Sequence, residues 1–357
     1  MKIVVAGMTS DVPGQGGATW AVLQYVLGLR KLGHEVVLVE PVRSLERSAG
    51  YFRRLARTFA LDAILLERGS DRRIELTSWR PDGADLLLNL SGVLPESFGA
   101  DLSVYVDLDP GFTQAWHVQG IDVGLDGHDR FVTVGRLVGQ AACPIPVCNR
   151  QWLTTSQPVV LDHWPYATRV RHEAATTVGN WRSYGSLVHD GINYGQRAHA
   201  TRELIRLPEL TKVSVLVALG IDPAERDDLA ALNDHGWQLT DPTRVASTPG
   251  AYRNFVQGSL LELGIAKRGY VESRSGWFSD RSVCYLASGR PVVAQDTGFA
   301  DWLPTGVGLL KFDTVEEAAA ALDEVVGDYD RHRRAARTIA DEVFDSDRVL
   351  KELLACL

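Results

Sequence analysis

Residues that could bind a diphosphate cluster in one segment of the sequence, between positions 266 and 302. Three cationic side chains stand in its first part: Lys267, Arg268 and Arg274. They precede a loop of small residues at 275–279, after which Ser279 or Asp280 is suited to cap a helix that runs to about residue 287. A helix N-terminus presents free backbone N–H groups and the positive end of the helix dipole. These features together would suit a diphosphate.

A glycine-rich loop follows the first predicted strand and offers a second place for an anion. Gly14, Gly16 and Gly17 stand just before a predicted helix. Glycine lets the backbone pass close to a ligand, and the helix N-terminus behind it favours an anion or a sugar oxygen. With Glu40 at the end of the next strand, the loop also fits part of a dinucleotide-binding fingerprint, although its third glycine position is Thr19. A purely structural role, in which the glycines only shape a turn, stays open.

Two carboxylates and a histidine in the first half of the chain are candidates for proton transfer. Asp107 and Asp109 stand at the end of a predicted strand over residues 102–107, and His128 follows downstream. An Asp or His can accept the proton of an attacking group. Asp109 is the first candidate for such a base and His128 the second. The alternatives are that 109–111, an Asp-Pro-Gly sequence, is an ordinary turn and that Asp107 caps a helix.

The elements that must position these residues alternate between strand and helix along nearly the whole chain. A buried strand is predicted at residues 2–6, a helix at 18–32 and a second strand at 35–40, which makes a βαβ unit. Such units build parallel sheets with right-handed crossovers. A second series of strands and helices starts at about residue 175, after a stretch at 157–172 that contains prolines and has no clear periodicity. The sequence thus predicts an α/β fold with two Rossmann-like parallel-sheet domains that face a central cleft.

The domain boundaries follow from this division. We expect an N-terminal domain over residues 1–165 and a C-terminal domain over residues 166–334. A C-terminal helix of about 335–357 is amphipathic enough to pack back on the first domain. In open α/β sheets, ligands bind outside the carboxyl ends of the strands, so both domains should present loops to the cleft.

The segment around the predicted diphosphate site resembles the donor-binding half of GT-B glycosyltransferases. The resemblance is carried by the Ser-Gly-Trp-x-Ser loop at 275–279 and by the pattern Gly-x-Pro-Val-Val-x-x-Asp-x-Gly at 289–298. The loop is similar to the His-Cys-Gly-Trp-Asn-Ser box of nucleotide-sugar-dependent members, and the whole chain follows the family outline. Three positions differ from family patterns. The paired glutamates of many retaining members fall on Gly276 and Cys284 here, and the histidine of the box falls on Arg274.

The resemblance implies a glycosyltransferase that moves a sugar from a nucleoside diphosphate sugar to a small-molecule acceptor. The donor-binding residues that it implies are Gly179, Asn180, Lys267, Arg268, Arg274, Ser275, Gly276, Ser279, Asp280, Asp296, Thr297 and Gly298. Gly16 and Gly17 would belong to an acceptor or phosphate loop, and Asp109 or His128 would be the base if the transfer inverts. No metal and no further cofactor are expected, because fixed cations and a helix dipole can carry the charge of the leaving group. The alternatives are a nucleotide-sugar epimerase of the same fold, an NAD(P)-dependent oxidoreductase, and a binding protein that keeps the sugar cleft without catalysis.

The composition indicates a folded protein and argues against several other classes. The 357 residues include 37 Lys and Arg against 45 Asp and Glu, a formal net charge of −8. We therefore expect no nucleic-acid partner, because nucleic-acid binders concentrate positive charge on one face. Apolar stretches are shorter than the ~20 residues of a membrane helix and no signal peptide is apparent, so a cytoplasmic protein without an integral membrane segment is expected. A homo-oligomer is compatible with the sequence, and the four cysteines do not make a disulfide framework.

Overall fold

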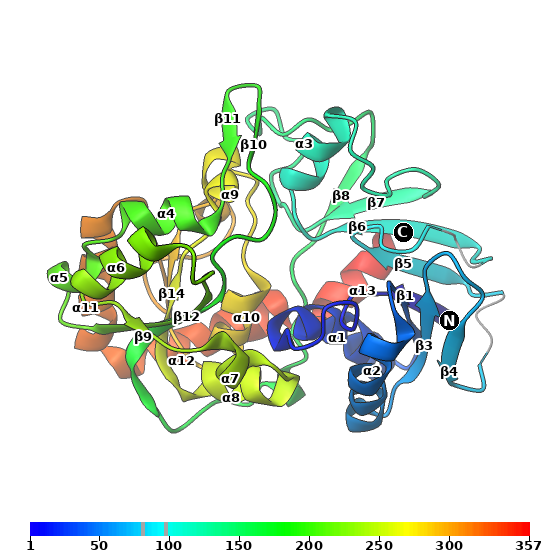
Figure 1. Cartoon of the computed structure of the whole chain (residues 1–357), viewed down its shortest axis with the longest axis horizontal. Helices are drawn as coiled ribbons and strands as arrows, with labels where there is room; N and C mark the ends of the chain where they lie inside the picture. Colours follow the sequence, from blue (N-terminus) through cyan, green and yellow to red (C-terminus); the bar gives the residue numbers. More distant parts are fainter. Residues whose placement is uncertain (80–82, 96–98) are drawn as a thin grey trace.

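The N-terminal half of the chain is built around one large sheet (Figure 1). The structure, a computed structural model, describes residues 1–79, 83–95 and 99–357. The sheet has eight strands in the order β4-β3-β2-β1-β5-β6-β7-β8, and all neighbours are parallel except β3 and β4. The strands are β1 (Lys2–Ala6), β2 (Glu35–Val42), β3 (Asp62–Glu67), β4 (Arg73–Leu76), β5 (Leu86–Leu90), β6 (Leu102–Asp107), β7 (Arg130–Thr133) and β8 (Trp152–Thr154). The helices are α1 (Gly16–Lys31), α2 (Leu45–Phe59) and α3 (Phe112–Val118).

The C-terminal half has a second, fully parallel sheet of six strands in the order β13-β12-β9-β14-β15-β16. These strands are β9 (His172–Asn180), β12 (Ser214–Gly220), β13 (Gln238–Leu239), β14 (Ser259–Gly264), β15 (Val292–Gln295) and β16 (Leu309–Phe312). The helices are α4 (Arg197–Glu203), α5 (Leu207–Leu210), α6 (Arg226–Asp234), α7 (Pro242–Ala246), α8 (Pro249–Gly258), α9 (Arg268–Ser273), α10 (Asp280–Ala287), α11 (Val315–Gly327), α12 (Tyr329–Ile339) and α13 (Ser346–Cys356). A short antiparallel hairpin, β10 (Leu187–His189) and β11 (Ile192–Tyr194), precedes α4. The predicted α/β fold with two Rossmann-like parallel sheets is confirmed.

The central strands are apolar along their whole length because both of their faces are covered. Ile3, Val4 and Val5 of β1 are fully buried, as expected for a strand inside a parallel sheet. Helix α2 instead is amphipathic and buries one stripe, which includes Phe52 and Leu55, against the sheet.

The predicted C-terminal helix is interrupted. A π-helical turn, Ala340–Phe344, separates α12 from α13. The interruption coincides with a pairing to the linker: the N–H of Val159 donates to the carbonyl of Phe344, and the N–H of Ser346 donates to the carbonyl of Val159. Helix α13 then packs on α1 of the N-terminal half, where a Cβ on Gly28 would lie 2.5 Å from Leu350.

Contacts between the two halves border the cleft on two sides. On one side, α1 approaches the α7–α8 corner so closely that a Cβ on Gly16 would lie 2.7 Å from the carbonyl oxygen of Ala246. The Trp20 indole N–H also donates to the carbonyl of Pro249 on that side, at 2.9 Å. On the other side, α3 meets α9, where a Cβ on Gly269 would lie 2.6 Å from the Phe112 ring. Figure 1 shows α1 and α10 between the two sheets.

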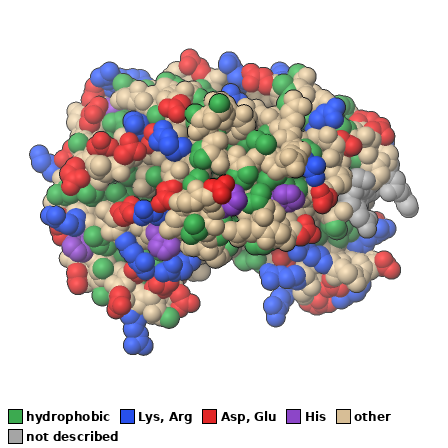
Figure 2. Space-filling model, turned by 90° about the horizontal axis from the view of Figure 1, so that it is seen from above, with side chains coloured by type: hydrophobic (Ala, Val, Ile, Leu, Met, Phe, Trp, Pro, Cys, Tyr) green, Lys and Arg blue, Asp and Glu red, His purple; other side chains and the backbone are tan. Residues whose placement is uncertain are grey.

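Charged side chains of both signs are mixed over the face that Figure 2 shows. Neither the Lys and Arg side chains nor the Asp and Glu side chains cover that face as one patch.

Candidate functional site

A cavity of about 580 Å³ lies between the two halves. We call it the central cavity. Its walls are the loop before α1, the ends of β9 and β12, the segment between β14 and α9, and the start of α10. Eight of the predicted site residues line it: Gly16, Gly17, Asp109, Gly179, Asn180, Lys267, Ser279 and Asp280. The structure therefore brings residues of the glycine-rich loop, of the strand end at Asp109 and of the segment at 266–302 together around one cavity.

A second, larger hollow of about 1260 Å³ lies in the N-terminal half, and we call it the N-terminal groove. It is lined by the β3–β4 connection, by the loop after β5 and by residues near α3, among them Arg68, Tyr105 and Trp116. Ser91 and Asp109 line both this groove and the central cavity. Asp109 thus lies where the two hollows meet.

One carboxylate oxygen of Asp109 accepts hydrogen bonds from three donors that lie across the cleft. Its Oδ1 accepts from the Tyr184 hydroxyl at 3.0 Å, from the Lys267 ammonium at 3.3 Å and from the Tyr270 hydroxyl. Burial alone would raise the pKa of Asp109, but the Lys267 charge and the two hydroxyls outweigh it and hold that pKa below its usual value. The carboxylate therefore stays ionised while these donors are in place.

The neighbouring carboxylate, Asp107, is buried and fully engaged inside the N-terminal half. It accepts from the Thr113 and Thr133 hydroxyls at 2.7 and 2.8 Å and from the Gln114 amide at 2.9 Å. Burial raises the pKa of Asp107 to about 6. Asp107 thus fixes the loop that carries Asp109 and does not face the cavity.

His128, the second base candidate, lies outside both hollows. Its Nε2 is 3.0 Å from the Asn89 amide nitrogen, its Nδ1 is 3.3 Å from the carbonyl of Leu125, and its ring packs edge-on against Tyr105. Burial lowers the pKa of His128. The structure does not bring His128 to Asp109, because the polar atoms of the imidazole are held within the β5–β7 region.

The start of α10 forms one wall of the central cavity. Ser279 caps the helix, its hydroxyl accepting from the N–H of Arg281 at 3.2 Å, as the sequence predicts. Asp280 follows in the first turn, and burial raises the pKa of its carboxyl group. The guanidinium of Arg281 pairs with the buried Glu262 and donates to the carbonyl of Val178.

Two cavity arginines, Arg197 and Arg281, were not expected from the sequence. Arg197 opens α4 and donates to the carbonyl of Ile265, while its Nε has no partner among the described residues. Burial, and then the Arg281 charge, lower the pKa of Arg197 to about 9. The sequence does mark both arginines as unusual, because each stands in the first turn of a helix, where the helix dipole disfavours a cation and favours an anion. Both side chains add positive charge to the cavity wall beside the helix N-termini.

Seven predicted donor-binding residues lie outside the central cavity, and six of them stand in two loops: Arg274, Ser275, Gly276, Asp296, Thr297 and Gly298. They join two adjacent loops to each other instead. The N–H of Gly276 donates to the carbonyl of Thr297, and Asp296 accepts from the N–H of Gly298, both at 2.9 Å. The Asp296 side chain is only 2% exposed and lies 3.6 Å from Arg274. These contacts occupy the groups that were expected to meet a sugar.

Arg268, the remaining predicted cation, turns away from the cavity. Its guanidinium pairs with Glu272 one helical turn along α9 and with Glu203 of α4. Only Lys267 of the three predicted cations lines the central cavity.

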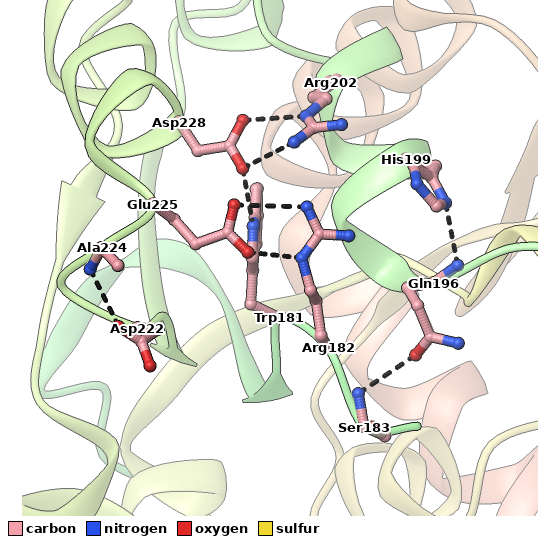
Figure 3. A network of polar contacts seen from close by, with 10 residues as sticks. All are labelled: Trp181, Arg182, Ser183, Gln196, His199, Arg202, Asp222, Ala224, Glu225 and Asp228. Carbon is pink, nitrogen blue, oxygen red and sulfur yellow. Dashed lines mark hydrogen bonds and ion pairs between the residues drawn. The ribbon is translucent and has the colours of Figure 1, made fainter. Parts of the chain in front are cut away.

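A network of polar side chains fixes the loop after β9 (Figure 3). Arg202 of α4 binds both oxygens of Asp228 at 2.8 and 2.9 Å, and the Trp181 indole N–H donates to the same carboxylate at 2.9 Å. Arg182 pairs with Glu225. Because Trp181 is 2% exposed, it supports the loop from behind and does not offer a stacking face to a ligand. Asn180 and Ser183 are thereby held at the cavity wall.

Glu40, on which a dinucleotide-binding interpretation depended, does not line the cavity. Its buried carboxylate accepts from the N–H and the hydroxyl of Thr9, at 2.8 and 2.9 Å. Burial raises the pKa of Glu40. The residue therefore anchors the loop before α1, and the glycines of that loop allow the close approach to α7 and α8.

The described parts of the chain, residues 1–79, 83–95 and 99–357, contain no group of three or more His, Cys, Asp or Glu side chains that could hold a metal ion. In the same residues we find no helix that has both the length and the apolar character to cross a membrane.

Comparisons with known proteins show which fold this is. No family model matches the chain, and no curated protein matches it in sequence. An alpha-glucosyltransferase solved with UDP and a mismatched DNA 13-mer has 13% identity and a TM-score of 0.61, over 100% of this chain and 99% of that one. Anabaena HepE, solved with UDP and glucose, has 12% identity and a TM-score of 0.60, over 100% of both chains. TarM has 10% identity and a TM-score of 0.63, over 99% of this chain and 98% of that one.

The fold is thus GT-B, as the sequence resemblance implied. One expectation is contradicted. Several of the similar structures are alpha-glucosyltransferases in complex with DNA, so the exclusion of nucleic acid as a partner was wrong. The net charge of a whole chain averages over its surface and says nothing about the charge of one groove.

Proposed function

We propose that the chain is a glycosyltransferase that moves a sugar from a nucleoside diphosphate sugar to a hydroxyl-bearing acceptor. One observation carries this proposal: a cavity edged by helix N-termini and cations meets a second groove at the carboxylate of Asp109. Solved proteins of the same fold bind UDP or UDP-glucose, which supports the choice of donor class.

The central cavity is the proposed donor site. The first turns of α1 and α10 direct backbone N–H groups and positive dipole ends to it, at Gly16, Gly17 and Ser279. Lys267 and Arg197 add positive charge on the same walls. These charges can stabilise the leaving diphosphate, so we propose a transfer that requires no metal and no further cofactor.

The N-terminal groove is the proposed acceptor site. Its volume of about 1260 Å³ exceeds that of the central cavity and would admit a small molecule or part of a larger one. We propose a small-molecule acceptor, and DNA oligonucleotides belong in the same acceptor screen because of the DNA-bound similar structures. We also propose that the protein is cytoplasmic.

Asp109 is the proposed base for a transfer with inversion. Its carboxylate would take the proton of the acceptor hydroxyl as that oxygen forms a bond to the anomeric carbon. The bond between the anomeric carbon and the donor phosphate oxygen breaks, and the nucleoside diphosphate leaves with the electron pair. The position of Asp109 at the junction of the two hollows supports this assignment.

The first test is binding, measured as thermal stabilisation by nucleoside diphosphates, their sugars, NAD and NADP. A ligand that binds only the native state raises the melting midpoint by mass action. Stabilisation by one nucleoside diphosphate and its sugars is expected, and stabilisation by NAD or NADP alone would contradict the proposal.

The second test is turnover of the sugar nucleotide that binds best, with a panel of acceptors that includes alcohols, glycans and DNA oligonucleotides. Acceptor-dependent release of the nucleoside diphosphate, with a product heavier by one sugar, is expected. Isomerisation of the sugar nucleotide without an acceptor would instead show an epimerase. Lys267→Met removes a cation of the proposed donor site and should slow this turnover. Arg268→Met is its matched control, because Arg268 is adjacent in sequence and faces away from the cavity.

A further inference from the structure

Lys267 lies between the proposed base and the proposed donor site. Its ammonium is 3.3 Å from Oδ1 of Asp109, and it also donates to the Tyr184 hydroxyl. The side chain is 13% exposed and lines the central cavity. Its charge lies 4.0 Å from the centroid of the Tyr184 ring and 5.2 Å from that of Phe112, within the range of a cation–π contact. The negatively charged partner of this lysine therefore comes from the opposite half of the chain.

The two arginines of the central cavity have partners in their own half. Arg281 pairs with Glu262, both buried, and Arg197 donates to the carbonyl of Ile265. A guanidinium is a rigid fork, whereas a lysine ammonium is a compact charge on a flexible stem with rotatable donors. In the part of the chain that the structure describes, Lys267 is thus the cavity cation best able to change partners.

The ammonium group of Lys267 cannot fully neutralise two anions at the same time. While it is beside Asp109, part of its charge is neutralised and unavailable to a ligand in the central cavity. While it is beside a diphosphate, Asp109 loses its charged partner and keeps only the hydroxyls of Tyr184 and Tyr270. A carboxylate without a neighbouring cation binds a proton more readily.

We propose that Lys267 exchanges partners during the reaction: it holds Asp109 until a donor diphosphate draws it away, and donor binding thereby releases Asp109 to act as the base. This inference rests on the proposed function. It makes the base available only when a donor is in place, so the donor binds before a productive acceptor. It also makes Asp109 and the diphosphate competitors for one cation.

A double-mutant cycle on nucleotide binding tests the exchange. The variants are Asp109→Asn, Lys267→Met and the double variant, and the probe is whichever of UDP, GDP, CDP, ADP and dTDP binds the unmodified chain most tightly by isothermal titration calorimetry. We expect Lys267→Met to weaken binding by about 10- to 100-fold, the range for loss of a charged hydrogen bond. Asp109→Asn should tighten binding by about 10-fold, because the lysine no longer has a competing carboxylate. In the Lys267→Met background, Asp109→Asn should leave the affinity unchanged.

Three results would overturn the exchange. Unchanged or weaker binding in Asp109→Asn would mean that the lysine bridges both anions or does not reach the ligand. An equal gain in the Lys267→Met background would mean that Asp109 repels the ligand directly, without the lysine. A loss in Arg268→Met as large as that in Lys267→Met would mean that the effect is not specific to the cavity. Lys267→Gln replaces Lys267→Met if that variant does not fold, and circular dichroism checks each variant.

The proposed function and the exchange fail in different ways. If none of the five nucleoside diphosphates binds the unmodified chain, the proposed function fails and the exchange fails with it. If one binds but the two substitutions show no coupling, only the exchange fails.

Discussion

The hydrogen bond from Tyr270 to Asp109 makes a measurable prediction about the pH dependence of the reaction. The hydroxyl donates to Oδ1 of Asp109, which also accepts from Tyr184 and Lys267. Each of these donors stabilises the ionised carboxylate and so lowers the pKa of Asp109. Tyr270→Phe removes one donor and leaves the ring in place, so the pKa of Asp109 should rise.

The size of the shift follows from the energy of one hydrogen bond to a charged group. Such a bond contributes about 1.5–3 kcal/mol, and ~1.4 kcal/mol corresponds to one pH unit. Because the Asp109 side chain is 36% exposed, solvent screens the interaction and the lower end of the range applies. We therefore expect the acidic limb of the kcat/KM profile to move up by about one pH unit in Tyr270→Phe.

The assay is the initial rate of acceptor-dependent nucleoside diphosphate release at a series of pH values. Tyr194→Phe is the matched control, because Tyr194 packs on Phe112 in the same aromatic cluster while its hydroxyl has no hydrogen-bond partner among the described residues. An acidic limb that stays in place in Tyr270→Phe, or that moves equally in Tyr194→Phe, would refute the assignment of Asp109 as the titrating base.

Three further predictions concern stability. Gly16→Ala should lower the free energy of unfolding, measured in urea, by about 1–3 kcal/mol, because the added Cβ would lie 2.7 Å from the carbonyl oxygen of Ala246. Gly250→Ala is the control and should not lower it, because the space around Gly250 is open. The stability difference between the unmodified chain and Asp107→Asn should change by about 2 kcal/mol between pH 4 and pH 7, in favour of the variant at pH 7. The sign follows because the pKa of Asp107 is about 6 in the folded state against an ordinary 3.8, so the folded chain binds this proton more tightly than the unfolded chain. Folding is therefore favoured by the protonated carboxyl group at low pH, and this contribution is lost as the pH rises through the window. Parallel pH dependences of the unmodified chain and the variant would contradict the burial argument. Arg281→Met should destabilise by about 3–5 kcal/mol because it leaves Glu262, which is fully buried, without its cation, and Glu262→Gln in addition should recover part of the loss.

The fold could be predicted from the sequence because its signals are local. Buried strands such as residues 2–6 and 35–40 are continuous apolar runs, and the helices between them show their period within one or two turns. The capping function of Ser279 was equally readable, since a cap depends on the residues next to it.

The site was predictable only in part because it depends on contacts between distant residues. The junction at Asp109 joins groups 75 to 161 positions apart, and no sequence pattern shows which strand ends meet across the cleft. For Asp296 the sequence motif does not reveal that the carboxylate accepts from the N–H of Gly298 in its own loop and does not line the central cavity. Arg197 and Arg281 went unnoticed although their place in a first helical turn is unusual for a cation.

The pairing of the linker with the interrupted C-terminal helix ties the two halves of the molecule together. The chain crosses from one half to the other twice, once near Val159 and once near Asp345, and these two crossings are bound to each other as a short parallel bridge. This bridge joins the two halves in addition to the contacts of α1 with the α7–α8 corner and of α3 with α9. A chain that ended before residue 345 would lose this bridge together with α13 and its packing on α1. The last twelve residues therefore help to fix the distance between the central cavity and the N-terminal groove by holding the two halves together, although none of them lines either hollow.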